Sequence, residues 1–475
     1  MIKLSKEQSI WKKYKRGVIE NVIGIGITAF LVYIIFVMIW YLLLKRSIAE
    51  AMLIGLVIVC AFNGVGTVPQ TFVTSLKDAV TQDVMAAIIL FTFMSSIMMK
   101  TGIIHRLVDI LNSILGRFRG GPAYVSACAS ALFGMVSGAS SANAATVGSI
   151  TIPWMKESGW PKEVASTMNT GNAGLGICIP PSSSMFLMLG LPAVAGTVKA
   201  GDLYFALLCG GLWTLVYRLL LTRYYVSKYH IPAVPKDRIE SLGKAVKKGG
   251  SSLFMFLGIA IPLVIITGPV GKVLETVASF GEDAVGAMNI IIWVPVLIMA
   301  ICMIEGRRFL PKTKEGWFEL VSSSAKTCCS CGAVSLFAMA GSNALTETGF
   351  GDELTVILAS LTFPKVVMLL IIGFIIALVA GPLNATSTTV SIGPVAYSAM
   401  VAVGVSPVTA VVCYLIFAST EGASPPMSSP IFVSSSIAGV EDVSVMFKPL
   451  IFHYCIPIVL VGVLVGLGIL PLIGG

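Results

Sequence analysis

The sequence predicts an all-α polytopic membrane protein built from two inverted repeats, each with a re-entrant hairpin and a broken helix. Its 475 residues are 56% hydrophobic and 12% charged, whereas soluble domains carry about 25% charged residues. Uncharged apolar runs exceed the roughly 18 residues that suggest a membrane span, as at 22–44 and 449–473. The two halves also carry matched motifs at matched spacings, which predicts the internal repeat.

Apolar segments follow one another along the chain. They lie at 22–44, 49–68, 84–99, 122–155, 163–199, 202–227, 252–270, 284–304, 320–345, 364–403, 405–440 and 449–473. The segments 122–155 and 364–403 are too long for one span, and small polar residues interrupt each near its middle. Such backbone is tolerated at membrane depth only inside protein or against a cavity, so we expect both to be re-entrant hairpins. We expect no cleavable signal peptide, because the first apolar run is too long and lacks a small-residue cleavage site.

Basic loops predict the orientation through the positive-inside rule. They also account for the net charge of +9 without a nucleic-acid partner. Lysines and arginines gather in 228–248 and 307–314, which we place in the cytoplasm, and the acidic stretch 347–353 then lies outside. The first hairpin would enter from the cytoplasm and the second from outside. The basic tail 1–16 conflicts with this rule if the helix 22–44 spans, because the tail would then lie outside.

Two helices carry residues that a helix in lipid should avoid. The stretch "GLGICIPPSSSMFLMLG" (174–190) lies within 163–199, and "TEGASPPMSSP" (420–430) lies within 405–440. Proline removes a backbone donor and clashes with the preceding turn. We therefore expect both helices to be broken, so that unwound carbonyls coordinate a cation and half-helix N-termini favour an anionic substrate.

An internal repeat links the two halves. Asn143 and Asn384 each begin an Asn-Ala pair ten residues before a proline, and Gly159 and Gly404 each precede a Pro-Pro pair by twenty-one residues. Opposite entry of the hairpins makes this an inverted repeat, which is typical of secondary transporters. The expected organisation is an N-terminal basic tail plus an extra apolar helix (1–48), a first repeat (49–227), a basic cytoplasmic loop (228–250) and a second repeat (251–475).

At these motifs the chain resembles a known family. "SGASSANAATVGSITIPWMKESGW" with "GICIPPSSSMFLMLG" is similar to the large membrane subunit of the tripartite ATP-independent periplasmic (TRAP) transporters. "TGIIHRLVDILNSILGRFRGG" looks like the family's interfacial arm, and "VGVSPVTAVVCYLIFASTEGASPP" looks like its second-half segment. The resemblance covers about residues 49–475, and residues 1–48 look like an addition.

The resemblance implies a function and partners. It implies sodium-driven import of a small organic anion, such as a C4-dicarboxylate or sialic acid, by an elevator-type movement of a domain that carries both hairpins. The implied partners are a soluble extracytoplasmic substrate-binding protein and a small four-helix membrane subunit in a bacterial or archaeal cytoplasmic membrane. Na⁺ is the implied coupling ion, and we expect no cofactor, no other metal and no enzymatic activity.

Two motifs depart from the family pattern. The usual Ser-Gly-Ser of the first hairpin is here Ser137-Gly138-Ala139, and the usual Thr-Pro-Pro is Ser424-Pro425-Pro426. A hydroxyl remains in each neighbourhood. Asn143 and "SIAG" (436–439) lean towards the branch served by TAXI-type binding proteins, whereas "IPPSSSMFLMLG" leans towards the dicarboxylate and sialic acid branch. The substrate therefore stays open.

We expect two Na⁺ sites, because hard cations prefer oxygen ligands. The first would use Ser140, Ser141 and Asn143 with backbone oxygens from Gly174 and Gly176. The second would use Asn384, Thr386 and Ser387 with Gly422 and Ser424. The residues expected near the substrate are Ser182, Ser183 and Ser428. The alternative is that these small residues serve close helix packing, with hydroxyls bonded to their own backbone.

Glu421 is a carboxylate within an apolar segment, where the family usually has an apolar residue. An ionisable group at membrane depth is expensive and marks a functional-site hypothesis. Glu421 would ligand a cation, carry a proton as a coupling carboxylate, or pair with Lys326. The remaining alternative is that it reaches an aqueous vestibule.

Two other functions compete with this interpretation. The first is a stand-alone ion-coupled organic-anion symporter or antiporter of the same superfamily, including an H⁺-coupled one. The second is an intramembrane serine protease, with "GASS" (138–141) and His453 as a base, although that function leaves the repeat unexplained. The chain has no Walker motif, so direct ATP drive is not expected. Its three histidines and ten cysteines show no metal-binding spacing.

Overall fold

The computed structural model describes residues 24–40, 44–81, 83–234, 239–267, 290–350, 353, 363–426 and 428–473. Over these residues the chain is helical and has no strand, apart from one isolated bridge between Arg119 and Ala233. This confirms the all-α class for the described part. The basic tail 1–16 and the start of the predicted segment 284–304, up to Asn289, lie outside the described residues.

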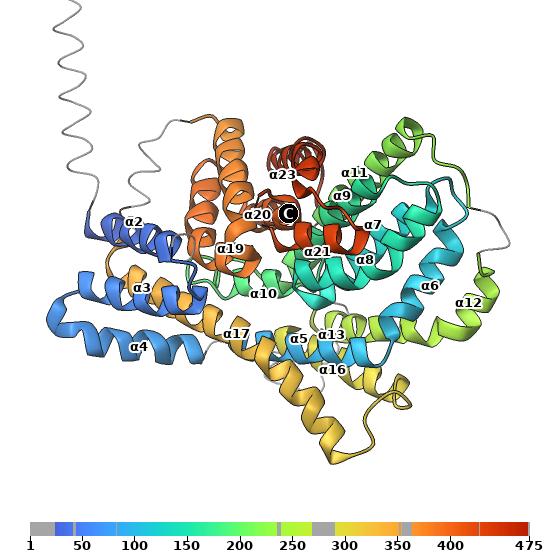
Figure 1. Ribbon diagram of the computed structural model, residues 1–475. Coiled ribbons are helices and arrows are strands. Elements are labelled where there is room, and N and C mark those ends of the chain that lie inside the picture. The colour runs from blue at the N-terminus through green and yellow to red at the C-terminus, as the bar shows by residue number, and fades with distance from the viewer. Residues whose placement is uncertain are drawn as a thin grey trace, which may run out of the picture.

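One group of helices, which we call the scaffold group, occupies the left and lower part of Figure 1. It comprises α2 (Ile25–Met38), α3 (Ile48–Phe62), α4 (Val68–Val80), α5 (Asp83–Lys100), α13 (Leu257–Thr267), α16 (Ile290–Glu305) and α17 (Lys314–Glu347). The long helix α17 packs against α3, α4 and α5, and α16 packs against α5 and α13. The scaffold group therefore takes helices from both halves of the chain.

A second group, which we call the site group, fills the upper right of Figure 1. Its first-half members are α7 (Gly121–Ser137), α8 (Ser140–Glu157), α9 (Lys162–Ala173), η3 (Gly174–Cys178), α10 (Ser183–Leu189) and α11 (Ala200–Lys228). Its second-half members are α19 (Lys365–Ala402), α20 (Pro407–Ala418), η6 (Glu421–Ala423), α21 (Ser429–Ala438), η7 (Val443–Met446), α22 (Phe447–Leu450), η8 (Ile451–Cys455) and α23 (Ile456–Gly466). Contacts between α8 and α21, and between α9 and α21, join the two halves.

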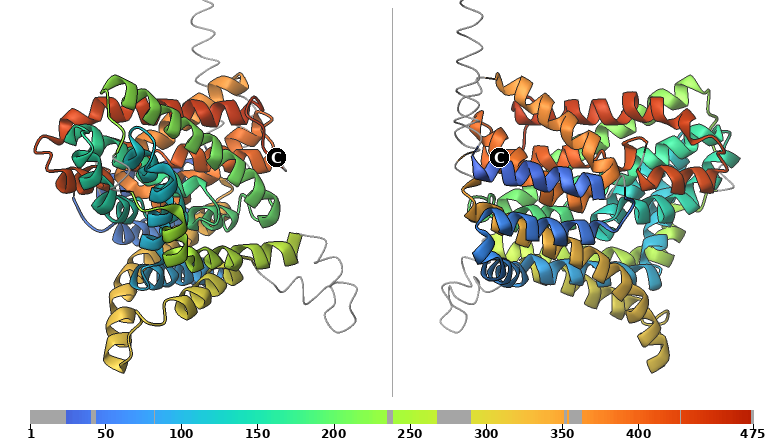
Figure 2. Two further views of the ribbon diagram at one scale, coloured as in Figure 1. Left: turned by 90° about the vertical axis from the view of Figure 1, so that its right-hand side faces the viewer. Right: turned by 60° about the vertical axis from the view of Figure 1, so that its left-hand side comes forward.

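Two short amphipathic helices lie at the edge of both groups (Figures 1 and 2). They are α6 (Ile103–Leu115) and α12 (Leu242–Gly249), which pack against each other. In α6 the buried residues Ile103, Leu107 and Ile110 recur at helical spacing, so one face is apolar. This face packs on α7, while η5 (Gly250–Phe256) covers α6 from the scaffold side. The segment that resembles the family's interfacial arm is thus an amphipathic helix.

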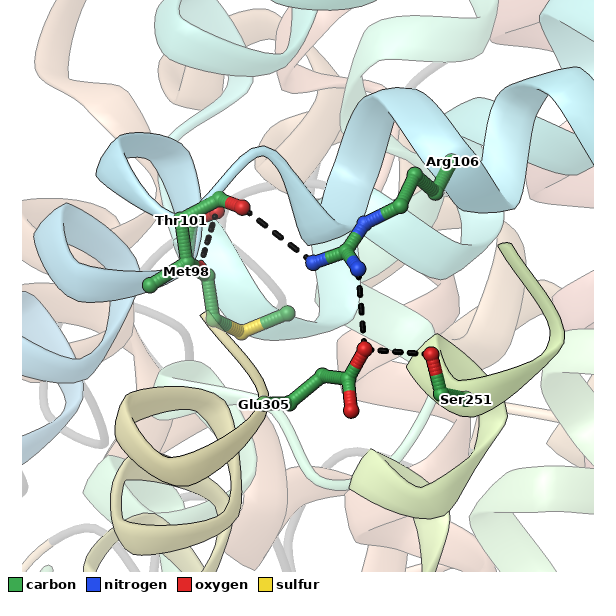
Figure 3. Close-up of polar contacts among 5 residues, drawn as sticks. All are labelled: Met98, Thr101, Arg106, Ser251 and Glu305. Carbon is green, nitrogen blue, oxygen red and sulfur yellow. Dashed lines mark hydrogen bonds and ion pairs between the residues drawn. The ribbon is translucent and has the colours of Figure 1, made fainter. Parts of the chain in front are cut away.

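A half-buried ion pair fastens α6 to the scaffold group (Figure 3). The Arg106 guanidinium lies 2.9 Å from the Glu305 carboxylate at the end of α16, and it also donates to the carbonyl of Thr101 at 3.2 Å. The Ser251 hydroxyl of η5 donates to the same Glu305 oxygen. Three elements that are distant in sequence therefore meet at one carboxylate.

Both predicted hairpin segments fold as pairs of helical limbs. In the first, Gly138 adopts a left-handed backbone with φ of 63° between α7 and α8, which favours glycine. The second is one helical element of 38 residues, which would be about 57 Å long if straight. Its first side chain, the Lys365 ammonium, nevertheless lies 3.2 Å from the carbonyl oxygen of Gly404, just past its end. The element α19 therefore turns back on itself, without the helix interruption that the sequence predicts near its middle.

The two predicted broken helices are interrupted where the sequence places the breaks. Helix α9 ends at Ala173, a 3₁₀ turn follows, and α10 begins at Ser183. In the second half α20 ends at Ala418, and α21 begins at Ser429. The peptide bonds of both proline pairs, Pro180-Pro181 and Pro425-Pro426, are cis.

Among the described helices, Ala200–Lys228 and Val443–Gly466 are long and apolar enough to cross a membrane by length and composition. Other apolar helices, including Ile25–Val37 and Ile292–Glu305, are shorter.

Helix α4 was not expected from the sequence. It packs against α17 and buries the small residues Thr71, Ser75 and Ala79, with the half-buried Val68, Phe72 and Leu76 beside them.

Candidate functional site

The two interrupted helices cross at a pair of glycines. A Cβ atom added to Gly422 would lie 2.9 Å from the backbone nitrogen of Gly174. A Cβ added to Gly174 would lie 2.2 Å from the carbonyl oxygen of Ser419. Real side chains do not approach backbone so closely, so the two breaks touch through main-chain atoms alone. The breaks from the two halves therefore form one junction, which we call the break junction.

Each hairpin meets the break of its own half in a similar way. In the first half, a Cβ on Gly134 of α7 would lie 2.8 Å from the Cα of Gly176. In the second, a Cβ on Gly381 of α19 would lie 2.6 Å from the carbonyl oxygen of Ser424. Because glycine has no Cβ, it lets two backbones approach closely. The hairpins and the breaks thus form one compact core.

Asn143 lies at this core and is fully buried. Its amide nitrogen donates to the carbonyl of Ser130 at 3.0 Å and to that of Ala173, the last residue of α9, at 2.7 Å. Its side-chain oxygen is buried without a hydrogen-bond partner. Buried polar oxygens are normally satisfied, and an unsatisfied oxygen beside the break fits the ligand chemistry expected of the first Na⁺ site.

The structure places Ser140 differently from the sequence-based expectation. We expected its hydroxyl at the first cation site, beside the carbonyls of Gly174 and Gly176. Instead, the hydroxyl, in the first turn of α8, donates to the carboxylate of Glu421 in the other half. The neighbouring Ser141 is half-buried. The sequence contains no signal for a pairing over 281 positions.

Glu421 lies in η6, between the two hairpins, and only 9% of its surface is exposed. Besides the Ser140 hydroxyl, the backbone of Ala385 in α19 lies close to its carboxylate. A residue from each hairpin segment therefore lies against the same carboxylate. The expected pairing with Lys326 stays a prediction, because that side chain lies outside the described residues.

The second predicted cation site is only partly described. The side chain of Asn384 lies outside the described residues, whereas Thr386 is half-buried and Ser387 is buried. The Ser424 hydroxyl donates to the carbonyl of Thr420 at 2.9 Å. Gly422 contributes its carbonyl to the Ser428 hydroxyl rather than to an open cavity. This second site therefore stays a prediction.

The serines expected near the substrate make local hydrogen bonds. The Ser182 hydroxyl donates to the carbonyl of Ile177 at 2.9 Å and accepts from the amide of Met185, which caps α10. The Ser428 hydroxyl donates to the carbonyl of Gly422 at 3.0 Å, and both serines are fully buried. Ser183 faces the hairpin turn, because a Cβ on Gly138 would lie 2.3 Å from its hydroxyl oxygen. At Ser182 and Ser428 the alternative of local backbone bonding therefore describes the observed contacts.

Three buried polar residues beside the first break were not singled out from the sequence. Asn169 donates to the carbonyl of Ala144 and to the Ser434 hydroxyl, both at 2.9 Å. Asn172 is buried, and both polar atoms of its side chain lack partners. Arg218 is 1% exposed and donates to the carbonyl of Gly171 at 3.3 Å. The spacing "NTGN" before the break, three residues apart on one helix, is the signal that would have found the asparagines.

The protease hypothesis finds no support in the geometry. The His453 ring bonds the Tyr225 hydroxyl, and its backbone carbonyl accepts from Tyr217. The Ser140 hydroxyl is bonded to Glu421. No hydrogen bond between His453 and a serine of "GASS" occurs among the described contacts, so the nucleophile and base of that hypothesis are not brought together.

An all-α fold in which interrupted helices from two halves cross, with a hairpin segment against each break, defines a transporter class of membrane protein. The chain belongs to the family described as "Tripartite ATP-independent periplasmic transporter, DctM component", whose model matches residues 27–467. The resemblance seen in the motifs is thereby confirmed over most of the chain.

Several relatives share this family. The isethionate TRAP transporter permease protein DctMQ of Oleidesulfovibrio alaskensis is 23% identical over 86% of this chain, which spans 61% of that longer protein. The C4-dicarboxylate TRAP transporter large permease protein DctM of Pseudomonas aeruginosa is 24% identical over 74% of this chain and 77% of its own length. The sialic acid permease SiaT of Haemophilus influenzae is 29% identical, over 38% of this chain and 27% of its own.

Two solved transporters share the fold. The Alcanivorax borkumensis YdaH transporter aligns with a TM-score of 0.63 at 16% identity, covering 85% of this chain and 89% of its own. Neisseria gonorrhoeae MtrF aligns with a TM-score of 0.61 at 13% identity, covering 84% of each chain. Identities this low carry the likeness of fold alone.

Proposed function

We propose that this chain is the large permease subunit of a tripartite system that imports a small organic anion, coupled to Na⁺, across a bacterial or archaeal cytoplasmic membrane. The observation that supports this most is the break junction, where the two interrupted helices cross beside the buried side-chain oxygen of Asn143, which has no hydrogen-bond partner. Relatives with this family model are named for isethionate, C4-dicarboxylates and sialic acid. All of these are small organic acids.

In this proposal the site group carries the substrate and ion, and the scaffold group stays in place. The contacts support the division, because helices of both halves pack within each group. Arg106 lies in α6, the helix that precedes the first hairpin, and its ion pair with Glu305 anchors α6 to the scaffold group. An elevator-type movement would then flex the chain at the arm, while the break junction moves as a unit.

Na⁺ binding at the first site would involve the side-chain oxygen of Asn143. The oxygen is already positioned, since the two hydrogen bonds of its amide nitrogen fix the side-chain plane. A cation there would lie at the C-terminal end of α9, where the helix dipole favours positive charge. Hydroxyl oxygens of the hairpin, such as that of Ser141, are the other side-chain ligands on this side for the ion.

The test is thermal unfolding of the purified chain in detergent, titrated with NaCl against KCl. A ligand that binds only the folded protein stabilises it by about 2.7 kcal/mol at 100 times its dissociation constant. We expect a saturable, sodium-specific rise in the melting temperature, lost in Asn143→Ala. The matched control is Asn63→Ala, which removes an asparagine of the scaffold group that bonds the carbonyl of Ala344. A sodium response retained in Asn143→Ala would overturn the assignment of this residue.

The tripartite organisation needs a separate experiment. We expect the chain to co-purify with a small four-helix membrane subunit. We also expect liposomes holding both subunits to import substrate only when a soluble binding protein is added. Import by the chain alone would instead establish a stand-alone symporter.

A further inference from the structure

Glu421 joins the two hairpin segments through a single carboxylate. The Ser140 hydroxyl donates to it from the first turn of α8, and the backbone of Ala385 lies close to it on α19, which packs against η6. These two neighbours belong to different halves of the chain. A movement that separates α8 from η6 must therefore break the hydrogen bond between Ser140 and Glu421.

No described cation neutralises this carboxylate. The ion pairs among the described residues join Arg46 with Glu50, Arg106 with Glu305 and Lys248 with Asp109. The titratable groups on the elements packed against η6 are Lys156, Glu157, Lys162, Glu163, Cys178, Lys365, Tyr397, His453, Tyr454 and Cys455. The lysines bind carbonyls at helix ends, namely those of Ala438, Gly439 and Gly404, and the Cys455 thiol donates to the carbonyl of Ala423.

The surroundings of Glu421 suit a proton better than a metal ion. A cation needs several oxygens with free lone pairs directed at it, whereas here the Ser140 hydroxyl donates to the carboxylate. Neighbouring hydroxyls on Thr420 and Ser424 donate to backbone carbonyls. No group of three His, Cys, Asp or Glu residues that would hold a metal occurs among the described residues.

Burial supplies the reason for proton binding. An unpaired ionised carboxylate in a low-dielectric interior is costly, and such a group normally takes up a proton instead. The protonated form keeps an acceptor oxygen for the Ser140 hydroxyl, so both forms fit the same position, which a coupling group requires.

We propose that Glu421 is a proton-binding site between the two hairpin segments, and that transport couples one proton in addition to sodium. The inference rests on the proposed transport function and deepens it by naming a second coupling ion. In each cycle the carboxylate takes up a proton from the outer side and releases it to the cytoplasm.

Infrared difference spectroscopy of the full chain in lipid vesicles tests the proposal directly. Samples titrated from acidic to basic pH in potassium buffer should lose a carbonyl stretching band of a protonated carboxylic acid. We expect this band to vanish in Glu421→Gln, which keeps the shape and one acceptor oxygen. The control is Glu441→Gln, because Glu441 is an exposed carboxylate in the same half, and it should leave the band intact. Ser140→Ala should change the pH at which the band disappears.

Two outcomes would overturn the proposal. One is a spectrum of the wild type without any acid band assignable to position 421 over the whole titration. The other is a Glu421→Gln variant whose melting temperature depends on pH as the wild type's does. Failure of the sodium proposal would look different, because it would remove the sodium response of the wild type and leave this infrared band unchanged.

Discussion

The backbones of Gly174 and Gly422 touch where the two interrupted helices cross, with room for no side-chain atom on either residue. Helix crossings in membranes commonly rely on small residues, but here the contact joins two short 3₁₀ segments, η3 and η6. This glycine pair fixes how the two halves of the site lie relative to each other.

We predict that Gly422→Ala and Gly174→Ala both destabilise the protein. The added methyl group meets backbone atoms at 2.9 Å in the first case and 2.2 Å in the second, and overpacking of this kind costs about 1–3 kcal/mol. Thermal unfolding in detergent measures the loss. Gly332→Ala is the control, since nothing surrounds a Cβ at that position in α17 and alanine is the better helix former. Equal melting temperatures for the two kinds of variant would contradict the crossing.

Asn169 should be a strong structural link between α9 and α21. Its amide donates to the carbonyl of Ala144 and to the Ser434 hydroxyl. Asn169→Leu removes both hydrogen bonds and leaves the buried Ser434 hydroxyl without this donor, and an unsatisfied buried group costs about 1–3 kcal/mol. We expect Ser434→Ala to cost less, because Asn169 keeps its other acceptor. A double-mutant cycle checks the pair, and a coupling energy of zero would show that the bond does not form.

The Arg106–Glu305 pair should couple more strongly than an exposed pair. Its side chains are 18% and 22% exposed, whereas those of Arg46 and Glu50 are 63% and 44% exposed. Exposed pairs contribute about 0.2–1 kcal/mol, and removing one partner of a buried pair costs about 3–5 kcal/mol. Double-mutant cycles on both pairs measure this. A larger coupling for Arg46 and Glu50 would be the contrary result.

The fold-back of α19 predicts a short distance between its two ends. Spin labels at positions 365 and 404, in a variant without reactive native cysteines, should report a short separation by pulsed electron resonance. A straight helix would place them about 57 Å apart. A second pair of labels, at positions 365 and 384, gives a reference distance within the same element. A distance near the straight-helix length would rule out the hairpin.

Much of this fold follows from local patterns in the sequence. Proline pairs, glycines and the Asn-Ala repeat place both breaks and the turn at Gly138, because these residues act on their own backbone. Helix α4 escaped prediction because the segment is less apolar than a membrane span, although Val68, Phe72 and Leu76 recur at helical spacing beside its buried small residues. The hairpin at 364–403 was expected from its length, but the helical turn of α19 was expected to be a break.

The site was predictable in its neighbourhoods and not in its contacts. Asn143 lies beside the first break, as its position in the repeat indicates. Ser140 was assigned to that break as well, but its hydroxyl binds Glu421. Which of two adjacent serines turns towards the other half depends on the rotation of α8 about its axis. That rotation is set by packing between helices far apart in sequence, which no local pattern encodes.

The two halves of the chain differ at one pair of equivalent positions. Gly176 and Glu421 each lie four residues before a cis proline pair, so they are counterparts. A Cβ on Gly176 would meet the backbone of Gly134, which leaves that half unable to accept any side chain, let alone an acid. The second half alone has room for the carboxylate. Placing the second break sequence in the first half would therefore put a glutamate where no side chain fits. Placing the first break sequence in the second half would put a glycine where a side chain has room, so the two halves are not interchangeable at this position.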